Sequence, residues 1–104
     1  LATANLVAAL DAGVTMVEGS ICGVGGGIAF PGGAGSVGNL PSEDIVHFLN
    51  EMGIETGIET KAAMAAARDV AAIAGIPAAS RLATVGTRQD IMRLGEDAPA
   101  AHPR

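Results

Sequence analysis

The residues of this sequence that could do chemistry lie in and around one glycine-rich stretch. More than half of the fifteen glycines fall between Gly23 and Gly38, together with Pro31, so this stretch favours neither helix nor strand and is predicted to be a long loop. Cys22, the one cysteine, stands directly before it. A thiol becomes reactive only when its surroundings lower its pKa. Two roles therefore stay open for Cys22, a catalytic acid or base and a small buried structural thiol.

The loop itself allows three interpretations. Residues 33–38 spell G-x-G-x-x-G, a pattern found in phosphate-binding turns, but these glycines do not directly follow a strand and no G-K-[ST] triplet is present. A second interpretation is a flexible connector that binds nothing. In the third, the loop leaves the carboxyl end of a buried strand and helps to build an active site.

Outside the loop, the composition argues against several kinds of site and partner. His47 has no second His or Cys at metal-ligand spacing, so we expect it to be a surface residue. The net charge is −5 and no basic run is present, which argues against a nucleic-acid partner. No apolar stretch is long enough to span a bilayer, and no signal-peptide pattern opens the sequence. Together with the single cysteine, these features favour a cytoplasmic location.

A helix and a strand are predicted before the loop. Apolar residues at helical spacing predict a helix over residues 1–12, ended by Gly13, and the β-branched run at residues 14–17 predicts a buried parallel strand. One strand cannot make a sheet, so its partners must come from residues upstream of Leu1 or from another chain. Leu1 already lies inside the helical pattern with no cap residue before it, so we expect the sequence to continue upstream.

Three helices are predicted after the loop. The first begins around Pro41, with two acids near the positive end of its dipole, and ends at Gly53. The other two cover residues 61–74, between a Thr60 cap and Gly75, and the short segment from Thr87, which pairs with Asp90 in a cap, to Gly95. We expect the tail from Ala98 to be disordered.

The composition favours part of a larger α/β body over a self-sufficient domain. Alanine and glycine dominate, and the aromatic residues are Phe30 and Phe48 alone. Small side chains allow helices to approach strands closely, but they supply little volume for an independent core. In an α/β barrel, the loops at the carboxyl ends of the strands build the active site, and the glycine-rich loop has that position.

Several motifs stand in a fixed order along the chain. They are Ala4-Asn5-Leu6, the strand and glycine segment of residues 17–26, Gly38-Asn39-Leu40-Pro41-Ser42-Glu43-Asp44, and Gly53-Ile54-Glu55-Thr56-Gly57. In combination they resemble the end of the hydroxymethylglutaryl-CoA lyase family, metal-dependent TIM-barrel enzymes that cleave or form carbon–carbon bonds next to a carbonyl. The resemblance covers about residues 1–76, and the combined spacing is far more specific than one glycine cluster.

The resemblance implies both a fold and a domain division. The fold is α/β, as the C-terminal part of a TIM (β/α)8 barrel. Residues 1–76 would carry the last helix, strand, loop and helix of the barrel, and residues 77–104 a partly disordered C-terminal extension. A chain of this extent would be an incomplete fragment, which we expect to be inactive alone.

For Asn39 the resemblance implies a ligand to a divalent metal, Mg²⁺ or Mn²⁺, through the side-chain oxygen. The other ligands would be an aspartate and a His-x-His motif that lie upstream. Without the resemblance, the sequence indicates a different role for Asn39, as a helix-start residue that caps free backbone amides.

The resemblance also implies a substrate loop, made of Gly23, Gly25, Gly26, Gly27 and Gly38. The family's loop cysteine, a catalytic acid or base, falls on Gly27 here. Cys22 stands a few residues earlier and would act in its place only if the loop folds back.

The implied function is metal-dependent cleavage of an acyl-CoA such as 3-hydroxy-3-methylglutaryl-CoA into acetyl-CoA and acetoacetate, with the metal as a Lewis acid. One alternative is a related condensing synthase or aldolase, although Gly26 and Gly27 replace the Glu-Arg pair of the synthases. Another is a non-catalytic small binding module. The implied partners are an acyl-CoA or small carboxylate and a second copy of the protein, in a homodimer that the helix of residues 61–74 would contact.

Overall fold

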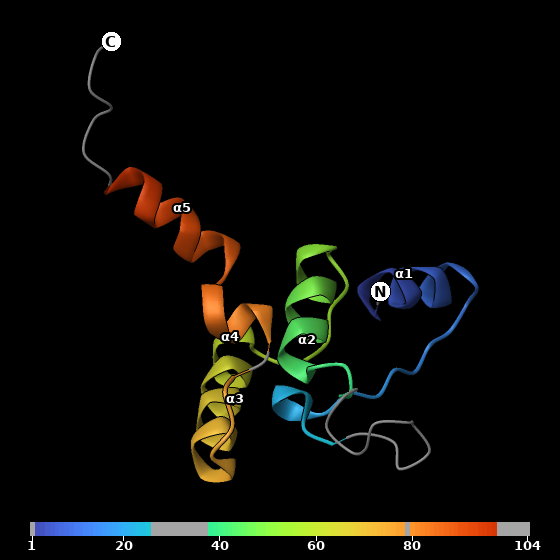
Figure 1. Cartoon of the computed structure of the whole chain (residues 1–104). Helices are drawn as coiled ribbons and strands as arrows, with labels where there is room; N and C mark the ends of the chain where they lie inside the picture. Colours follow the sequence, from blue (N-terminus) through green and yellow to red (C-terminus); the bar gives the residue numbers. More distant parts are fainter. Residues whose placement is uncertain (1, 26–37, 79, 98–104) are drawn as a thin grey trace.

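The computed structural model describes residues 2–25, 38–78 and 80–97 (Figure 1). In chain order its elements are α1 (Ala2–Asp11), the 3-10 turn η1 (Ile21–Gly23), α2 (Ser42–Glu51), α3 (Thr60–Ala74), α4 (Arg81–Val85) and α5 (Arg88–Glu96). Three predicted helices are confirmed. The helix predicted over residues 1–12 is α1, the helix predicted between Pro41 and Gly53 is α2, and the helix predicted over residues 61–74 is α3. Within these ranges, no helix is long and apolar enough to cross a membrane.

The two ends of α3 show which local signals hold. Gly75 follows the helix with φ 66°, in the left-handed conformation predicted for it. Thr60 is the first helical residue and not the cap as predicted, because Glu59 takes the cap position without a side-chain bond. The Thr60 hydroxyl instead accepts a hydrogen bond from Asn50 Nδ2 at 3.1 Å. Thr60 therefore joins α3 to the end of α2.

The strand predicted over residues 14–17 is absent from the described part of the chain. This segment runs irregularly between α1 and η1, and the β-type pairing in these ranges is one isolated parallel bridge between Ser20 and Pro41. A strand is defined by a neighbour that takes up its backbone N–H and C=O groups, and the described residues supply none for residues 14–17. Met16 is accordingly 81% exposed. The α/β class is thus not visible in the described residues, which are helical.

The core lies where α3 meets η1 and α2. Cys22 packs with Ala67 and Ala71 of α3, and Ile21 and Val70 lie against them. Alanines at this contact let the backbone of η1 approach α3 closely, which a larger side chain would prevent. The abundance of alanine therefore serves close packing around the turn.

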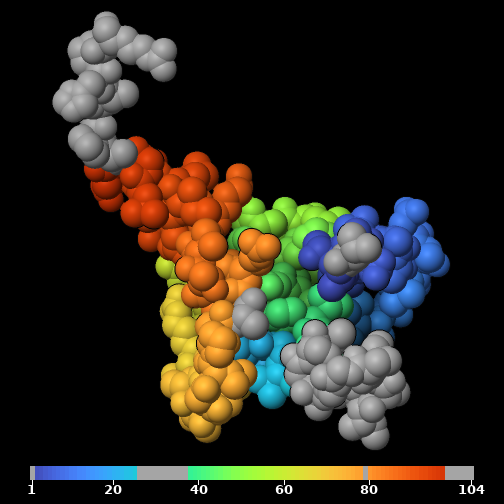
Figure 2. Space-filling model, viewed as in Figure 1, coloured from blue at the N-terminus to red at the C-terminus, as the bar shows by residue number. Residues whose placement is uncertain are grey.

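The chain after α3 forms two more helices. Helix α4, which was not predicted from the sequence, packs against α2 and α3 and buries Leu82. Helix α5 has the predicted capping box, in which Thr87 and Asp90 bond each other's backbone amides, but it continues through Gly95 to Glu96. No residue of α5 is buried, and in the space-filling view it projects from the body formed by α2, α3 and α4 (Figure 2). The predicted disorder from Ala98 lies outside the described residues.

Candidate functional site

The η1 turn holds the most unusual backbone in the described residues. Cys22 has φ 59° and ψ 11°, a left-handed conformation that costs a residue with a Cβ about 1–2 kcal/mol. Gly23 continues the turn with φ 68°, and its amide donates to Ser20 O at 2.9 Å. The next amide, of Val24, donates to Ile21 O at 3.2 Å. The chain therefore reverses direction tightly at the start of the glycine-rich stretch.

Asn39 contacts this turn from the far end of the loop. Its backbone amide donates to Gly23 O at 3.2 Å, and its side-chain Nδ2 donates to Val24 O at 3.0 Å. A carbonyl oxygen only accepts, so the nitrogen end of the Asn39 amide must face Val24. The oxygen end, Oδ1, is consequently turned away from the turn, on a residue that is exposed.

The capping role that the sequence alone indicated for Asn39 is wrong. The residue at the cap position of α2 is Pro41, and no side chain bonds the first amides of that helix. Asn39 lies before the cap and uses both of its nitrogen atoms on the η1 turn. Its side chain is therefore available for a role other than helix capping.

Glycine is required where the two ends of the loop meet. Gly25 has φ 110°, and a Cβ on it would lie 2.7 Å from Asn39 Nδ2. A Cβ on Gly38 would lie 2.8 Å from Gly23 O. Three glycines of the predicted substrate loop therefore lie around Asn39, namely Gly23, Gly25 and Gly38. Gly26 and Gly27 of that prediction lie outside the described residues, as does most of the G-x-G-x-x-G at residues 33–38.

A pair of backbone bonds fastens the turn to the start of α2. The Ser20 amide donates to Leu40 O and the Ser42 amide donates to Ser20 O, both at 2.9 Å. This approach needs Gly19, since a Cβ there would lie 2.8 Å from Leu40 O and 2.7 Å from Ile45 Cδ1. The segment before η1 and the segment before α2 thus lie side by side in parallel.

The Cys22 side chain points into the core and not toward Asn39. It is 1% exposed and packs against alanines of α3. A reactive thiol needs contact with a substrate or a base, and burial among alanines supplies neither. The burial favours the structural alternative for Cys22 over the catalytic one.

The role of Glu43 was not predicted from the sequence. Glu43 was placed with Asp44 as an acid near the positive end of the α2 dipole, yet its side chain is fully buried. Its Oε2 accepts a hydrogen bond from the Cys22 amide at 3.0 Å. Burying a carboxylate is unfavourable unless it is well bonded, so such a residue marks a structural or functional requirement. The signal that was available is the presence of an acid inside the G-N-x-x-[ST]-E-D motif itself.

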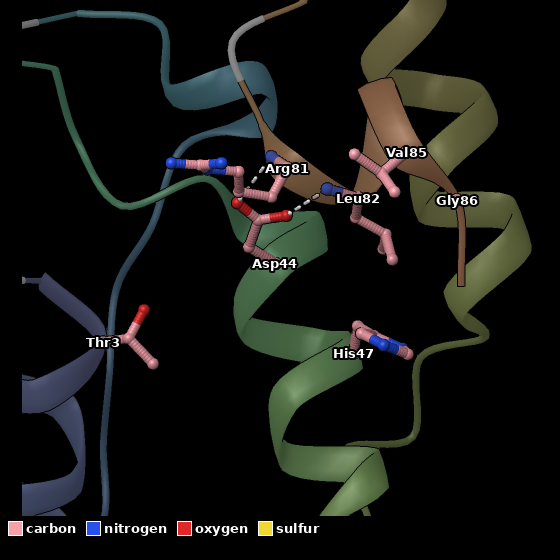
Figure 3. A pocket seen from close by; sticks show the side chains of 7 residues that line it. All are labelled: Thr3, Asp44, His47, Arg81, Leu82, Val85 and Gly86. Carbon is pink, nitrogen blue, oxygen red and sulfur yellow. Dashed lines mark hydrogen bonds between the residues drawn. The ribbon is translucent and has the colours of Figure 1, made fainter. Parts of the chain in front are cut away.

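Asp44 next to it has a separate contact. Its carboxylate oxygens accept from the backbone amides of Arg81 and Leu82, at 3.3 and 3.0 Å, at the start of α4 (Figure 3). These residues line one side of a cavity of about 330 Å³ between α1, α2 and α4. His47, predicted to be a surface residue, is half-buried in the wall of this cavity. The cavity is lined by other residues than the turn around Asn39, and Asp44 already serves α4 there.

A carboxyl with a lowered pKa, that of Asp90, also lies away from the turn. Hydrogen bonds from the Thr87 amide and the Thr87 hydroxyl to Asp90 lower the pKa of that carboxyl below its ordinary value of 3.8. Asp90 is 3.9 Å from Lys61 Nζ, which acts in the same direction. This shift has a structural cause, the capping box of α5.

The described residues fit a hard cation at one point. Asn39 is an exposed residue whose Nδ2 is fixed on Val24 O, and its remaining amide oxygen, Oδ1, is the kind of donor that Mg²⁺ and Mn²⁺ accept. No group of three or more His, Cys, Asp or Glu side chains able to hold a metal lies within the described ranges. Within those ranges, the oxygen donor of the Asn39 amide therefore has no cluster of further ligands beside it.

Comparison with known proteins matches this chain to a family of lyases. The HMGL-like family model matches residues 1–70. A hydroxymethylglutaryl-CoA lyase of Bacillus subtilis is 40% identical over 80 residues, 77% of this chain and 26% of the relative. The mitochondrial hydroxymethylglutaryl-CoA lyase of Mus musculus is 46% identical over 57 residues, 55% of this chain and 17% of the relative. An (R)-citramalyl-CoA lyase of Chloroflexus aurantiacus is 38% identical over 74 residues, 71% of this chain and 22% of the relative.

The match is long in this chain and short in the relatives. The chain spans about a quarter or less of the length of the curated relatives it matches. No solved structure gives a significant match. The matched region contains η1, Asn39 and Glu43. Since the family model covers well over half of the residues, the chain belongs to the HMGL-like family.

Proposed function

We propose that this chain is the C-terminal part of a metal-dependent lyase that cleaves a carbon–carbon bond in an acyl-CoA such as 3-hydroxy-3-methylglutaryl-CoA. The products would be acetyl-CoA and acetoacetate. The observation that carries the proposal is the position of Asn39, whose side-chain oxygen is turned outward from a glycine turn in a chain of the HMGL-like family. Relatives that match the same region are named as lyases of acyl-CoA thioesters.

In this proposal Asn39 is one ligand of the metal. The Val24 and Gly23 carbonyls hold its two nitrogen atoms, so Oδ1 needs little reorganisation to bind a cation. The remaining ligands, an aspartate and a His-x-His motif, would come from the part of the protein upstream of Leu1. When bound, the metal supplies a Lewis acid for the substrate oxygens. Gly25 keeps the backbone close to Asn39 without a side chain in between.

The segment of residues 14–17 supports the barrel part of the proposal. Val14 is 43% exposed. Together with Val17 it lines a cavity of about 490 Å³, whose other walls include residues of α2 and of the segment that follows α2. Apolar side chains of this kind are normally buried, and a β-branched run next to an apolar cavity fits the last strand of a barrel whose other strands lie upstream. The chain alone would then be inactive.

A different acyl-CoA is the second candidate substrate, and Cys22 is the observation that favours it. The family's loop cysteine falls on Gly27, and Cys22 is buried, so its thiol is not presented to a substrate. The relative from Chloroflexus aurantiacus is named as a lyase of citramalyl-CoA. A lyase or aldolase that uses another acid in the cysteine's place is consistent with both facts.

Assembly and location remain predictions. Helix α3 exposes Ile73 at 86%, which suits the predicted contact with a second copy of the protein. The names of the relatives do not decide between locations. One lyase of Mus musculus is named as mitochondrial and another as cytoplasmic. The cytoplasmic location stays a prediction.

The direct test is a cleavage assay on the full-length protein with 3-hydroxy-3-methylglutaryl-CoA and Mg²⁺ or Mn²⁺. We expect wild type to release acetyl-CoA, and Asn39→Ala to lower kcat/KM by about 100-fold or more, because a metal ligand is lost. Gln89→Ala removes an exposed amide on α5 and serves as the control. Cys22→Ala should change kcat/KM little, since the thiol is buried.

Two results would contradict the proposal. Full activity of Asn39→Ala would exclude this residue as a ligand. A folded wild-type protein that binds Mn²⁺ but cleaves neither 3-hydroxy-3-methylglutaryl-CoA nor citramalyl-CoA would exclude the acyl-CoA lyase reaction for the substrates considered.

A further inference from the structure

Glu43 is the buried titratable group that the proposed reaction does not use. It is 0% exposed, on the first turn of α2, and its Oε2 accepts from the Cys22 amide at 3.0 Å. The other carboxylate oxygen, Oε1, is buried and has no hydrogen-bond donor in the part of the chain that the structure describes. A buried carboxylate with one unpaired oxygen is unfavourable, so a specific requirement must retain it.

The bond from Glu43 reaches a strained residue. Among the described residues other than glycine, Cys22 has a positive φ. Such a conformation is unfavourable and persists only where several surrounding contacts hold it in place. The Cys22 thiol packs into the core, and its amide bonds Glu43. Glu43 therefore holds the backbone half of the turn, while alanines of α3 hold the side chain.

The residues directly after Cys22 then hold Asn39. Gly23 O accepts the Asn39 amide and Val24 O accepts Asn39 Nδ2. The direction of both carbonyls depends on the turn at Cys22. Glu43 and Asn39 are thus connected twice, once along the chain through Pro41 and once through the η1 turn.

We propose that Glu43 is a positioning residue for the metal site: by holding the Cys22 amide it aligns the carbonyls that orient the Asn39 side chain. The inference rests on the proposed function in that Asn39 is taken as a ligand. Glu43 acts through hydrogen-bond acceptance, and its negative charge is not required. It does not bind the metal itself, since its side chain is buried beneath the turn while Asn39 is exposed.

The experiment compares two neutral replacements of Glu43 in the full-length protein. Glu43→Gln keeps an oxygen that can accept from the Cys22 amide, and Glu43→Met fills a similar volume without an acceptor. Removing the buried charge in both variants keeps the fold accessible, because an apolar group of similar volume is tolerated at such sites. Glu55→Ala, an exposed acid, is the control.

Two measurements are made on each variant. The dissociation constant of Mn²⁺, from the electron paramagnetic resonance signal of the free ion, reports the metal site. The side-chain NH₂ resonances of Asn39 in the metal-free protein report its orientation without any metal or turnover. We expect Glu43→Met to weaken Mn²⁺ binding by about 10-fold or more and to lose the distinct Asn39 NH₂ signals, with Glu43→Gln within about 3-fold of wild type.

If Glu43 acts by positioning Asn39, replacing Glu43 should have little effect on Mn²⁺ binding once Asn39 is removed. In an Asn39→Ala background, Glu43→Met should weaken Mn²⁺ binding by less than about 2-fold further, because residues that act as one unit are not additive. Full additivity, or Glu43→Met with unchanged Asn39 signals, would overturn the inference. Glu43→Gln as weak as Glu43→Met would overturn it too, since the charge would then be what matters.

The two proposals fail in different ways. If Asn39→Ala binds Mn²⁺ like wild type, the metal site is wrong, and the Asn39 signals still decide whether Glu43 positions that side chain. If Asn39→Ala loses Mn²⁺ but Glu43→Met does not, the metal site stands and the role of Glu43 is wrong.

Discussion

The η1 turn and helix α5 are held by opposite kinds of contact. Besides two local backbone bonds, the η1 turn is held by hydrogen bonds between residues distant in the sequence, such as Cys22 with Glu43 and Val24 with Asn39. Helix α5 is capped by Thr87 and Asp90 within its own first turn, and it buries no residue. The turn therefore depends mainly on long-range bonds, while the start of α5 is set by its local sequence and its contacts with Glu51 and Lys61 are made by exposed or partly exposed side chains. Perturbing each region should produce effects of different size and reach.

Among changes that do not remove Asn39 itself, the largest effect is expected from Gly25→Ala. A Cβ at this position would lie 2.7 Å from Asn39 Nδ2 on a backbone with φ 110°, so the Asn39 side chain must move. If the proposed lyase activity holds, we expect kcat/KM of the full-length protein to fall by about 10- to 100-fold, the range seen when groups that orient a metal ligand are lost.

Gly13→Ala is the matched control for this comparison. Gly13 has φ 94°, a similar backbone strain, but nothing lies within 4 Å of a Cβ built on it. The Gly13→Ala variant should have a lower free energy of unfolding than wild type, with an unchanged kcat/KM. Equal losses of kcat/KM in the two variants would show that strain alone, and not contact with Asn39, explains the effect.

A smaller effect is expected from Asp44→Ala. This variant tests the contact between α2, which follows Asn39, and α4, which precedes α5. Asp44 accepts from the amides of Arg81 and Leu82, so its loss leaves the start of α4 without an acceptor from α2. Loss of a helix-capping acceptor costs about 0.5–2 kcal/mol. Faster hydrogen exchange at the Leu82 amide, with unchanged Mn²⁺ binding, is the expected result. Unchanged exchange at Leu82 would mean that α4 does not depend on α2.

The smallest effect is expected from acid titration of α5. Hydrogen bonds from Thr87 hold the pKa of Asp90 below its ordinary value of 3.8. A carboxyl whose pKa is lowered in the folded state stabilises that state above its unfolded pKa, and this stabilisation is lost as the pH falls through the folded pKa. The contribution is small because Asp90 is solvated.

Nuclear magnetic resonance of the Thr87 amide measures this effect. In wild type its chemical shift should change as the pH falls below 3.8, and in Asp90→Asn it should not. Asp97→Asn, after the end of α5, should titrate like wild type at Thr87. Structure at η1 should be unaffected in both variants, because α5 buries none of its residues.

Local signals predicted most of the helices. An apolar face bounded by glycine was enough for α2 and α3, and the Thr87 and Asp90 pair was enough for the start of α5. Helix α4 was missed because it is five residues long and depends on contacts elsewhere, through Leu82 in the core and Asp44 at its start. The strand predicted at residues 14–17 does not form in the described part of the chain. A strand needs a neighbouring strand to pair with, and the local sequence does not contain one.

The candidate site divides in the same way. The motif around Asn39 predicted a role for that residue and for the glycines before it, and the structure brings Gly23 and Gly25 next to Asn39. The orientation of Asn39 could not be predicted, because it depends on two carbonyls on the far side of the loop. Glu43 was missed for a similar reason, since an acid on the first turn of a helix is normally solvated.

The sequence by itself determined the local features of this protein, which are the longer helices with their glycine ends and the family motif. Those features depend on backbone preference and on contacts within one turn, and both can be read along the chain. Only the tertiary structure decided that Glu43 is buried, that Cys22 points into the core and that Asn39 turns its oxygen outward. Each of these depends on a hydrogen bond or a packing contact between segments that are distant in the sequence.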